Sequence, residues 1–401
     1  MIHWPVLDVR LVDPSLFTAP YDAALTEGLL ACNVRPLWAT RPTRQGDRQE
    51  IAAPYVDAFF YRRVDEALQL PRPLRALAKG CAHALGLARL VARVWRGRPD
   101  VVHVQWVVLP PLDALALLLI RARCALVLTV HDTVPFNGER LSLLQNLGFG
   151  VPIRLAHRVI VHTQAGRQTL IDRGVAPAKI HVVPHGPLQL PLAPRQAADA
   201  ATAAPRDPRW TLVLFGEIKP YKGLDILIDA LSMLSGAQRQ GLRVIVAGRP
   251  RMDLGALTAR VNALGLGDTL EWRTHRHSDQ EMADLFDAAD GFVFPYRQID
   301  ASGVYFLVKS LGKWLIASRV GIFAEDLQEG VDGALLPSGD SAALAAEIAR
   351  AAALRRPPRP LDATDSWEQI GAATRGVYEA AISSSQAAHE SAWVAARRHS
   401  R

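Results

Sequence analysis

The chain has 401 residues, enough for two or three domains, and 49% of them are hydrophobic, enough for large buried cores. Its cysteines, Cys32, Cys81 and Cys124, have neither disulfide nor zinc-ligand spacing, which predicts a reducing compartment and excludes a cysteine zinc site. The net charge of +7 is uneven, because residues 1–190 hold 22 Lys and Arg against 14 Asp and Glu, whereas residues 191–401 hold 24 against 25. The first half is therefore expected to face an anionic partner, although arginine enrichment from a GC-rich genome is an alternative.

Neither the N-terminal residues nor the most apolar stretch predicts a membrane-directed segment. The residues "MIHWPVLDVRLVD" have no basic head followed by an apolar core, so no signal peptide is expected. Residues 107–120 are interrupted by Pro110, Pro111 and Asp113, and they are fewer than the ~20 that a membrane-spanning helix needs. The sequence thus predicts a cytoplasmic protein, soluble or bound peripherally at the inner face of the plasma membrane.

The first long helical pattern covers residues 70–99 and is basic throughout. It contains seven Lys and Arg side chains and no acid, with several leucines, Val94 and Trp95 among them. A basic amphipathic helix can rest on an anionic membrane, where each Lys or Arg contributes about 1 kcal/mol. The alternative is a helix that packs on the sheet and exposes a solvated charged face. Nucleic acid is not expected as a partner, because stacking aromatic residues and recognition motifs are missing here.

Short apolar runs then alternate with helical patterns. Continuous apolar runs are typical of strands covered on both faces. Helices are predicted between them, for example at 223–231, with apolar residues at helical spacing, and at 278–290, which opens with a Ser278–Glu281 capping box. The alternation predicts α/β domains with parallel sheets. The predicted strands cover residues 101–109, 125–130, 158–163, 180–185, 210–216, 242–248, 269–273, 291–296 and 314–318.

An Ala- and Pro-rich segment, residues 188–209, has no apolar period and is predicted to be a linker. It separates an N-terminal domain, residues 1–187, from a C-terminal domain, residues 210–364. Residues 365–401 are predicted to contain a helix and a polar tail. Doubly wound sheets bind ligands at the carboxyl ends of their strands, so two such domains that face each other are expected to form a binding cleft.

The segment "GEIKPYKGLDILIDAL" begins at Gly216 and joins a predicted strand to a predicted helix. It carries Lys219 and Lys222 in a turn that ends at Gly223. A helix N-terminus with two ammonium groups beside it favours an anion, and glycines let the backbone approach a ligand. The spacing is neither that of a P-loop nor that of a GxGxxG fingerprint. Two solvated loop charges are the alternative.

A second strand-to-helix loop contains Ser302 and Gly303, where a helix from about Val304 is expected to begin, with Arg297 and Asp300 beside them. The amides and the Ser302 hydroxyl can hold a phosphate oxygen or a sugar hydroxyl. The alternative is an ordinary N-cap serine, which is common.

These segments together resemble the GT-B glycosyltransferases, specifically the large retaining family 4. The likeness covers roughly residues 5 to 380. It implies two doubly wound Rossmann-like domains facing across a cleft, with the C-terminal helix crossing back to the first. It rests on "FGEIKPYKGLDILIDAL", "VIVAG", "LFDAADGFVFPYRQIDASGV", "GKWLIASRVGIFAEDL" and "GVDGALLPSGDSAALAAEI", and in the first half on "VVHVQW", "LTVHDTVP", "VIVHTQAGRQTLIDRGV" and "IHVVPHGP".

The resemblance implies transfer of a sugar, with retention at the anomeric carbon, from a UDP- or GDP-linked donor to a saccharide acceptor. The family's expected route is front-face attack, in which the leaving phosphate takes the acceptor proton. No metal and no other cofactor are implied. The "YR-x-I-x-x-SG" segment, which begins at Tyr296, resembles exopolysaccharide transferases, so a polyprenyl-diphosphate-linked acceptor at the membrane is expected.

Residue roles follow from the same resemblance. Lys219 and Lys222 are implied to neutralise the donor diphosphate, and His131 to contact the donor sugar near the reacting carbon, with Asp132 orienting it or facing the acceptor. Asp300 completes the implied catalytic set. The implied donor-binding residues are Gly216, Glu217, Gly223, Arg249, Tyr296, Arg297, Ser302, Gly303 and Glu325.

The chain departs from the family pattern in two places. The family usually has two glutamates eight residues apart around the Ser-Gly position, where this chain has Asp300 and Val308. Val308 cannot accept a hydrogen bond from the ribose, so the ribose is expected to be held elsewhere. The family's Gly-Gly loop is replaced by residues 17–25, in which Tyr21 and Asp22 are expected on the acceptor side.

Two other functions therefore stay open. The first is a non-catalytic GT-B scaffold or partner subunit, which the valine favours. The second is a sugar-nucleotide 2-epimerase, which would release free epimerised donor without an acceptor.

Overall fold

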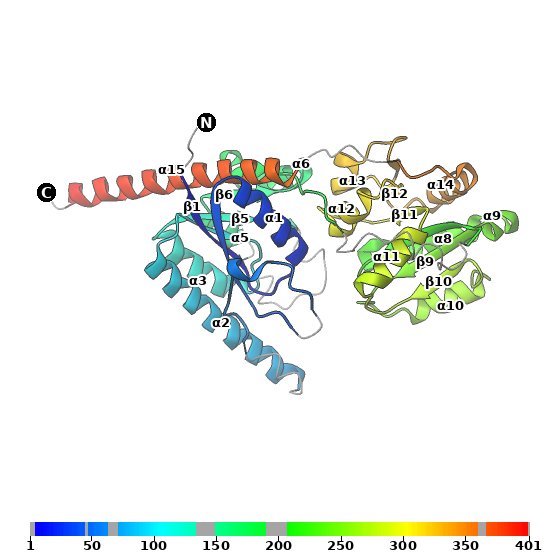
Figure 1. The fold of residues 1–401 in the computed structure, drawn as a ribbon, viewed down its shortest axis with the longest axis horizontal. Helices are drawn as coiled ribbons and strands as arrows, with labels where there is room; N and C mark the ends of the chain where they lie inside the picture. Colours follow the sequence, from blue (N-terminus) through cyan, green and yellow to red (C-terminus); the bar gives the residue numbers. More distant parts are fainter. Residues whose placement is uncertain are drawn as a thin grey trace. The chain divides into compact units, whose positions relative to one another are not determined.

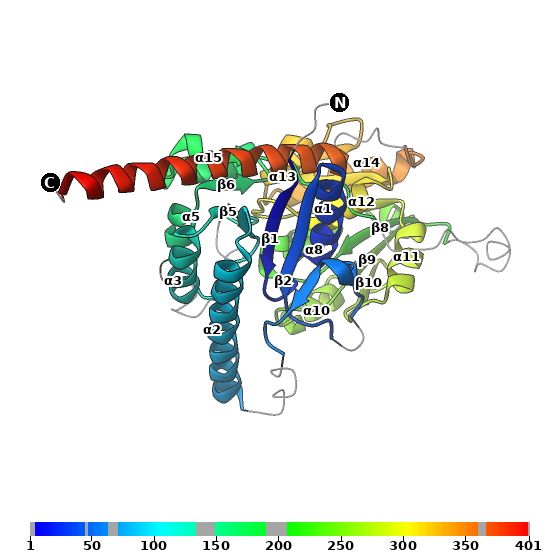
Figure 2. The same cartoon turned by 60° about the vertical axis from the view of Figure 1, so that its left-hand side comes forward.

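The structure is a computed structural model that describes residues 5–44, 47–62, 71–133, 148, 150–189, 207–359 and 366–399. The chain divides into two compact units, one formed by residues 1–186 with 365–401 and the other by residues 187–364. Each unit is built on one parallel sheet with helices around it (Figures 1 and 2). The predicted α/β class with two Rossmann-like domains is thus confirmed. The predicted linker lies mostly outside the described residues.

The sheet of the first unit has the strand order β3-β2-β1-β4-β5-β6-β7, and every neighbouring pair is parallel. The central strands β4 and β5 are buried along their whole length, as strands with helices on both faces have to be. Parallel pairing brings the carboxyl ends of the strands to one edge of the sheet. The strands are β1 Leu7–Asp13, β2 Val34–Thr40, β3 Val56–Ala58, β4 Val101–Val104, β5 Ala125–Thr129, β6 Arg158–Val161 and β7 Ile180–Val182.

Helices of the first unit pack around this sheet. In both views α2 lies beside α3, and α3 lies beside α5 (Figures 1 and 2). No helix among the described residues is long and apolar enough to cross a membrane. The helices are α1 Ala19–Ala31, α2 Arg72–Gly97, α3 Pro110–Arg121, α5 Gly150–Leu155, α6 Gln164–Asp172 and α15 Trp367–His399.

The last helix, α15, belongs to the first unit and packs on α1. The two helices approach so closely that glycine is required on both. A Cβ at Gly28 would lie 2.0 Å from the carbonyl oxygen of Trp367, and a Cβ at Gly371 would lie 2.2 Å from the Gly28 oxygen. Val377 and Tyr378 are buried further along the same helix. The C-terminal helix thus completes the core of the N-terminal unit.

The sheet of the second unit has the order β10-β9-β8-β11-β12-β13, again with parallel neighbours. Its strands are β8 Trp210–Phe215, β9 Leu242–Ala247, β10 Leu270–Arg273, β11 Gly291–Phe294, β12 Trp314–Ser318 and β13 Gly333–Leu336. Its helices are α8 Leu224–Met233, α9 Gly236–Gln240, α10 Gly255–Ala263, α11 Asp279–Ala288, α12 Gly303–Lys309, α13 Gly321–Asp326 and α14 Ser341–Leu354, with the 3₁₀ turn η5 Pro220–Lys222 before α8.

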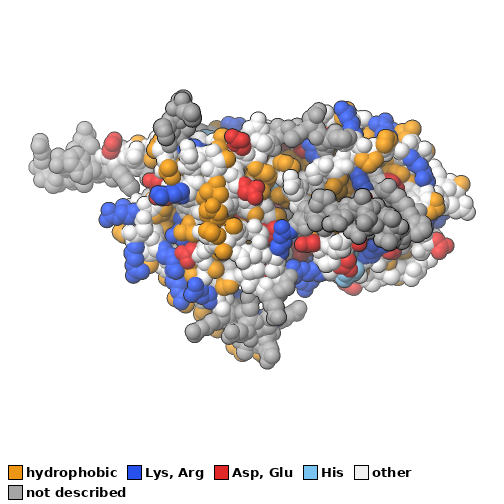
Figure 3. All heavy atoms as spheres, viewed as in Figure 1, with side chains coloured by type: hydrophobic (Ala, Val, Ile, Leu, Met, Phe, Trp, Pro, Cys, Tyr) orange, Lys and Arg blue, Asp and Glu red, His pale blue; other side chains and the backbone are white. Residues whose placement is uncertain are grey.

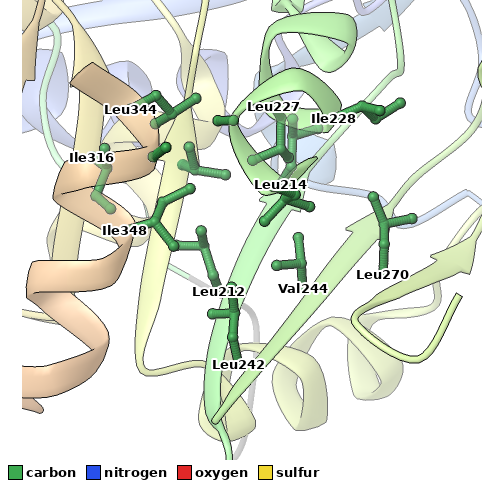
Figure 4. Close-up of a cluster of buried hydrophobic side chains, with 14 of the residues drawn as sticks. Leu212, Leu214, Leu227, Ile228, Leu242, Val244, Leu270, Ile316, Leu344 and Ile348 are labelled. Atoms are coloured by element: carbon green, nitrogen blue, oxygen red, sulfur yellow. The ribbon is translucent and has the colours of Figure 1, made fainter. Parts of the chain in front are cut away.

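One apolar cluster joins the second sheet to α8 and α14. Figure 4 shows Leu212 and Leu214 of β8 facing Leu227 of α8 and Ile348 of α14. The exposed fraction of all four side chains is 0%. At ~1.5–3 kcal/mol per buried aliphatic side chain, this cluster strongly stabilises the unit. It fixes the carboxyl end of β8 and the start of α8 relative to each other.

Local sequence signals explain most element boundaries. The Ser278–Glu281 capping box is present at the start of α11, as predicted. The nine predicted strands are all found, within a few residues at their ends. The structure adds β1, β2, β3 and β13, which were not predicted. In β1 the exposed Asp8 interrupts the apolar run, and in β2 Pro36 does so.

The close contact of α1 and α15 makes a stability prediction. We expect Gly371→Ala to destabilise the first unit by about 1–3 kcal/mol, because the new methyl group overlaps the backbone of α1. Gly376→Ala on the same helix is the matched control, because a Cβ there meets nothing within 4 Å. The control should gain about 0.5–1 kcal/mol of helix propensity. Urea unfolding of both variants measures the difference, and equal effects would contradict the close packing.

Candidate functional site

The side chain of Lys222 is the most unusual charge in the second unit. It lies in η5, at the carboxyl end of β8, and its exposed fraction is 5%. Its Nζ lies 3.4 Å from the carbonyl oxygen of Phe215 and 5.3 Å from the ring centre of Tyr296. Burial, followed by repulsion from Lys219, lowers the pKa of Lys222 to about 7, although Glu217 opposes the shift. No carboxylate of the described residues forms an ion pair with this ammonium group, and Glu217, which acts on it from a distance, is itself paired with Lys219 and Arg251.

Two glycines permit this arrangement. Gly216 has a φ of 105°, and a Cβ there would lie 2.9 Å from Lys222 Nζ. Gly223 has a φ of 68°, and a Cβ there would lie 1.9 Å from the carbonyl oxygen of Pro295. Both positions combine a backbone conformation that favours glycine with a close approach of other atoms. Gly216 thus leaves room for the lysine, and Gly223 lets the turn pass close to the chain after β11.

The second lysine of the loop is tied to a carboxylate. Lys219 Nζ lies 3.3 Å from Glu217 Oε2, and Arg251 Nε donates to the other oxygen, Oε1, at 2.7 Å. Burial opposes ionisation of Glu217, but the Arg251 hydrogen bond and the charge of Lys219 outweigh it and lower the pKa. Glu217, predicted to bind the donor, is thus the counter-charge of the cations around the loop.

The loop is fastened from the neighbouring strand. Arg297, which follows β11, donates to both carboxylate oxygens of Asp225, at 2.9 and 2.5 Å. Its Nη1 also donates to the Pro220 carbonyl oxygen at 3.2 Å, and its backbone N–H donates to the Tyr221 carbonyl oxygen at 2.8 Å. A bidentate arginine pair of this kind fixes geometry as well as charge. Arg297 therefore positions the turn that carries Lys222.

Two further predicted residues lie next to this loop. Ser302 is the N-cap of α12, and its Oγ accepts the Tyr305 N–H at 3.4 Å. Ser302 is therefore an ordinary N-cap serine, which was the alternative to phosphate or sugar binding. Tyr296 is 1% exposed, and its buried hydroxyl lies near the Ser302 side chain, on the ring whose centre is 5.3 Å from Lys222 Nζ.

The other predicted donor residues lie nearer to solvent. Arg249, Gly303 and Glu325 are exposed, and Asp300 is half-buried. Val308 is different, because it is fully buried in an apolar cluster that also contains Phe323. A carboxylate is therefore replaced by a core residue at this position, as the sequence indicated.

In the first unit, His131 follows β5 and is held from several sides. Its Nε2 lies 3.0 Å from Gln105 Oε1, and its Nδ1 lies 3.2 Å from His162 Nε2. The Trp106 ring stacks on the imidazole, with centres 4.9 Å apart and planes 9° apart, and Tyr21 meets its edge. The neighbouring strands β4, β5 and β6 supply these groups at their carboxyl ends.

The tautomer of His131 follows from this chain of contacts. His162 Nδ1 lies 2.9 Å from the Val183 carbonyl oxygen, so it donates and His162 Nε2 accepts from His131 Nδ1. Burial, then the charges of neighbouring histidines, lowers the pKa of His131, so the ring is neutral and its Nε2 accepts. The Gln105 atom that lies 3.0 Å from Nε2 must then be a donor, which is the amide nitrogen and not Oε1. The hydrogen-bond network decides which of the two amide atoms occupies this position. Both ring nitrogens therefore already have a hydrogen-bond partner, and a sugar hydroxyl can bond to one of them only if it displaces Gln105 or His162.

Three predicted residues of the first unit lie in surroundings that the sequence did not indicate. Gln105 and His162 contact the His131 ring nitrogens, and Asp132 lines a pocket beside the ring, so its role stays a prediction. Tyr21 and Asp22 were expected on the acceptor side. Their exposed fractions are 3% and 0%, so their side chains offer no surface to an acceptor.

Gln105, Trp106 and His162 were missed as site residues. Gln105 and Trp106 follow β4, but they fell inside a strand that was predicted to run on to residue 109, whereas His162 follows β6. A polar or aromatic residue at the carboxyl end of a parallel strand was the available signal. Among the described residues, no group of three or more His, Cys, Asp or Glu side chains is arranged to hold a metal ion. Independence from metals stays a prediction.

Comparison with known proteins agrees with this fold. The family described as Glycosyltransferase Family 4 matches residues 38–186, and the family described as Glycosyl transferases group 1 matches residues 209–353. Together the two matches span most of the chain, which belongs to the GT-B glycosyltransferases of family 4. D-inositol 3-phosphate glycosyltransferase of Mycobacterium sp. (strain KMS) is 29% identical over 275 residues, 65% of this chain. The match spans 60% of that relative's length.

Solved structures share the fold. Anabaena Alr3699/HepE in complex with UDP and glucose has a TM-score of 0.62 and 18% identity, covering 97% of this chain and 100% of that one. The catalytic domain of Starch Synthase IV from Arabidopsis thaliana, bound to ADP and acarbose, has a TM-score of 0.68 and 11% identity. It covers 95% of this chain and 100% of that one. At these identities the likeness establishes the two-domain architecture.

The buried ammonium of Lys222 makes a prediction for the free protein. A lysine whose folded pKa is lowered to about 7 destabilises the fold while it is protonated, and this cost disappears as pH rises from about 7 toward the ordinary value of 10.5. We therefore expect Lys222→Met to raise Tm at pH 6 and to lose this advantage by pH 10. Lys79→Met, at an exposed lysine of α2 in the first unit, is the control, and its unfolding curve should stay parallel to that of wild type. A pH series of thermal unfolding measures both, and parallel curves for Lys222→Met and wild type would contradict the buried charge.

Proposed function

We propose that the protein transfers a sugar from a nucleotide-sugar donor, UDP- or GDP-linked, to an acceptor hydroxyl, with retention at the anomeric carbon and without a metal. The observation that carries this proposal is the buried ammonium of Lys222, which forms no ion pair with a carboxylate of the described residues. Buried charges are normally paired, and Lys219 adds a second cation beside it. A diphosphate supplies the missing negative charge. Support comes from the Anabaena and Arabidopsis structures, which contain UDP and ADP.

The chemistry uses the lysines to stabilise the leaving group. The bond between the anomeric carbon and the diphosphate oxygen breaks, and the acceptor oxygen bonds to the same face of that carbon. The acceptor proton passes to the leaving phosphate. Charge that develops on the phosphate is stabilised by preorganised cations in a water-poor site, which is the role of Lys219 and Lys222. The neutral His131, whose ring nitrogens are bonded to Gln105 and His162, is suited to contact the donor sugar through its fixed ring rather than to transfer a proton.

We propose a lipid-linked saccharide as the acceptor, in the synthesis of exopolysaccharide or a cell-envelope glycan. The enzyme would then be cytoplasmic and peripheral at the plasma membrane. The name of the mycobacterial relative contains a phosphorylated compound, D-inositol 3-phosphate. A phosphate or diphosphate on the acceptor also suits the excess of positive charge in residues 1–190.

The outer faces of α2 and α3 support the membrane part of the proposal. On α3, Leu112, Leu115, Leu118 and Leu119 are exposed, with exposed fractions from 39% to 60%. The only acid of that helix, Asp113, is buried. On α2, Leu74, Leu77 and Leu85 are exposed among Lys79, Arg89 and Arg96, and this helix has no acid. Figure 3 shows blue Lys and Arg side chains at the lower left, over the helices that Figure 1 labels α2 and α3.

A non-catalytic scaffold remains the second candidate because of Val308. Its side chain is part of the core, so the carboxylate that grips the ribose in the family has no replacement at this point of α12. A protein that had lost donor binding would tolerate such a change. Binding and turnover experiments separate this candidate from the transferase.

The transferase proposal predicts the effect of the lysines on activity. With a panel of UDP- and GDP-sugars, wild type should hydrolyse or transfer one donor, and Lys222→Met should lower kcat by about 100-fold or more, the scale of losing one oxyanion-stabilising group. Lys219→Met should act in the same direction. Lys179→Met in the first unit is the control and should retain wild-type turnover.

The same experiment distinguishes the alternatives. Proton NMR of the product reports whether the anomeric configuration is retained, and EDTA should leave the rate unchanged. Nucleotide binding without turnover would favour the scaffold, and release of epimerised donor without acceptor would favour a 2-epimerase. No affinity for any nucleotide would overturn the assignment of the lysine loop.

The membrane proposal is tested with lipid vesicles. We expect wild type to sediment with vesicles that contain phosphatidylglycerol and not with pure phosphatidylcholine vesicles at moderate salt. Leu115→Glu on α3 should weaken the association by about tenfold or more, because each inserted CH₂ contributes about 0.8 kcal/mol. Leu354→Glu, an equally exposed leucine of the second unit, is the control. If both substitutions act alike, or if wild type does not sediment, the membrane surface lies elsewhere or does not exist.

A further inference from the structure

Two carboxyl groups are buried side by side in the first unit, outside the groups used above. Asp13 ends β1, and Asp22 lies in the first turn of α1. Both side chains are 0% exposed, and no Lys, Arg or His of the described residues forms an ion pair with either of them. Two ionised carboxylates in such a place repel each other and lack solvation, so one of them keeps a proton.

The hydrogen-bond donors indicate which carboxyl carries the negative charge. Asp13 Oδ1 accepts the Ser15 N–H at 3.1 Å, and Oδ2 accepts the Thr18 N–H at 3.2 Å. The Phe17 N–H points to the same carboxyl. Several amides and the N-terminal end of α1 all favour an anion. Burial raises the pKa of Asp13, but these amides and a hydrogen bond from Asp22 oppose the rise, so Asp13 is the member of the pair that ionises first, and it holds the turn of residues 13–18 closed.

Asp22 has the complementary environment. Its Oδ1 accepts the Thr18 hydroxyl at 3.3 Å, whereas its Oδ2 is buried and receives no hydrogen bond from a donor of the described residues. A proton on Oδ2 that is donated to Asp13 satisfies both groups. Burial, followed by the charge of Asp13, raises the pKa of Asp22 well above its ordinary value of 3.8.

The carboxyl pair is connected to the histidine site. The Thr18 hydroxyl, which donates to Asp22, accepts the Trp106 Nε1–H at 3.0 Å. The Trp106 ring is the one that stacks on His131, and Phe17 packs against the same indole, with centres 5.3 Å apart. The turn held by the pair thus fixes the ring that covers the imidazole.

The other titratable groups around the pair do not neutralise it. Tyr21 of α1 is buried and uncharged, and Arg41, after β2, donates to the Ser15 carbonyl oxygen at 3.0 Å and to Asp47 at 3.1 Å. Tyr61, after β3, donates to or accepts from His83 at 2.8 Å. On α15, Arg375 lies at the other end of α1, where it is paired with Glu379 and donates to the Cys32 carbonyl oxygen.

We propose that Asp13 and Asp22 share one proton and are positioning residues for the His131 side of the transfer site. While the proton is present, the turn of residues 13–18 is closed and Trp106 is held against His131. Loss of the proton at high pH places a second charge in the buried site, opens the turn and releases the indole. The catalytic part of this inference rests on the proposed transferase function, but the shared proton does not.

The shared proton is tested by stability alone. The folded protein binds it more tightly than the unfolded chain, so the stability that it provides is complete below the ordinary Asp pKa and declines as pH rises toward the raised pKa of Asp22. Asp22→Asn keeps the donor and the acceptor but cannot ionise. The Tm of Asp22→Asn relative to wild type should therefore rise by about 3 °C or more between pH 5 and pH 9. A difference that does not change with pH would overturn the shared proton.

The positioning role is tested by kinetics on the full chain. Thr18→Val removes the hydroxyl between Asp22 and Trp106, and we expect a kcat about tenfold lower with nucleotide affinity unchanged, because the proposed nucleotide site is in the second unit. Asp22→Asn should keep its own neutral-pH kcat up to a higher pH than wild type keeps its own. Equal kcat and pH profiles for all three proteins would overturn the positioning role. If no protein in the series shows turnover, the proposed function fails, while the pH dependence of Tm still decides the carboxyl pair.

Discussion

The ammonium group of Lys222, enclosed in the second unit without a carboxylate partner, is the constraint on which that part of the structure depends. A charge in such a place is unfavourable, so the surrounding chain has to hold it there. Gly216 leaves room for it, Gly223 lets the next helix begin close to β11, and the Arg297–Asp225 pair fastens the turn from outside. The cores of the unit supply the rigidity that this arrangement requires. The folding free energy that is lost by burying the Lys222 ammonium group is therefore consistent with a site that binds an anion.

The two units contribute different chemical groups, charged in the second unit and neutral in the first. The second unit gathers cations at the carboxyl edge of its sheet. The corresponding edge of the first unit holds neutral rings, because burial lowers the pKa of His131 strongly and those of His103 and His185 to about 3. A neutral, fully hydrogen-bonded ring has a fixed orientation and tautomer. Such a fixed, neutral surface suits contact with an uncharged sugar, whereas the cations suit a phosphate.

Much of the fold could be predicted from the sequence, because strands buried on both faces appear as continuous apolar runs, as in β8, β9 and β12. Strands with an exposed or broken pattern, such as β1 with Asp8, gave no such signal. The lysine loop was found because its parts are neighbours in the chain. The contacts of His131 were not found, because Gln105 and His162 lie 26 and 31 residues away and meet it only through strand order. The burial of Asp22 depends likewise on how α1 packs against the sheet.

The return of α15 to the first unit has a consequence for biosynthesis. During translation, residues 187–364 emerge before the helix that fills the groove along α1. The second unit therefore has its whole sequence available while the first still exposes the apolar side chains that Ile370, Val377 and Tyr378 later cover. Domains generally fold as units during synthesis. On the ribosome the second unit can thus fold before the first, because the first unit needs α15 to complete its core.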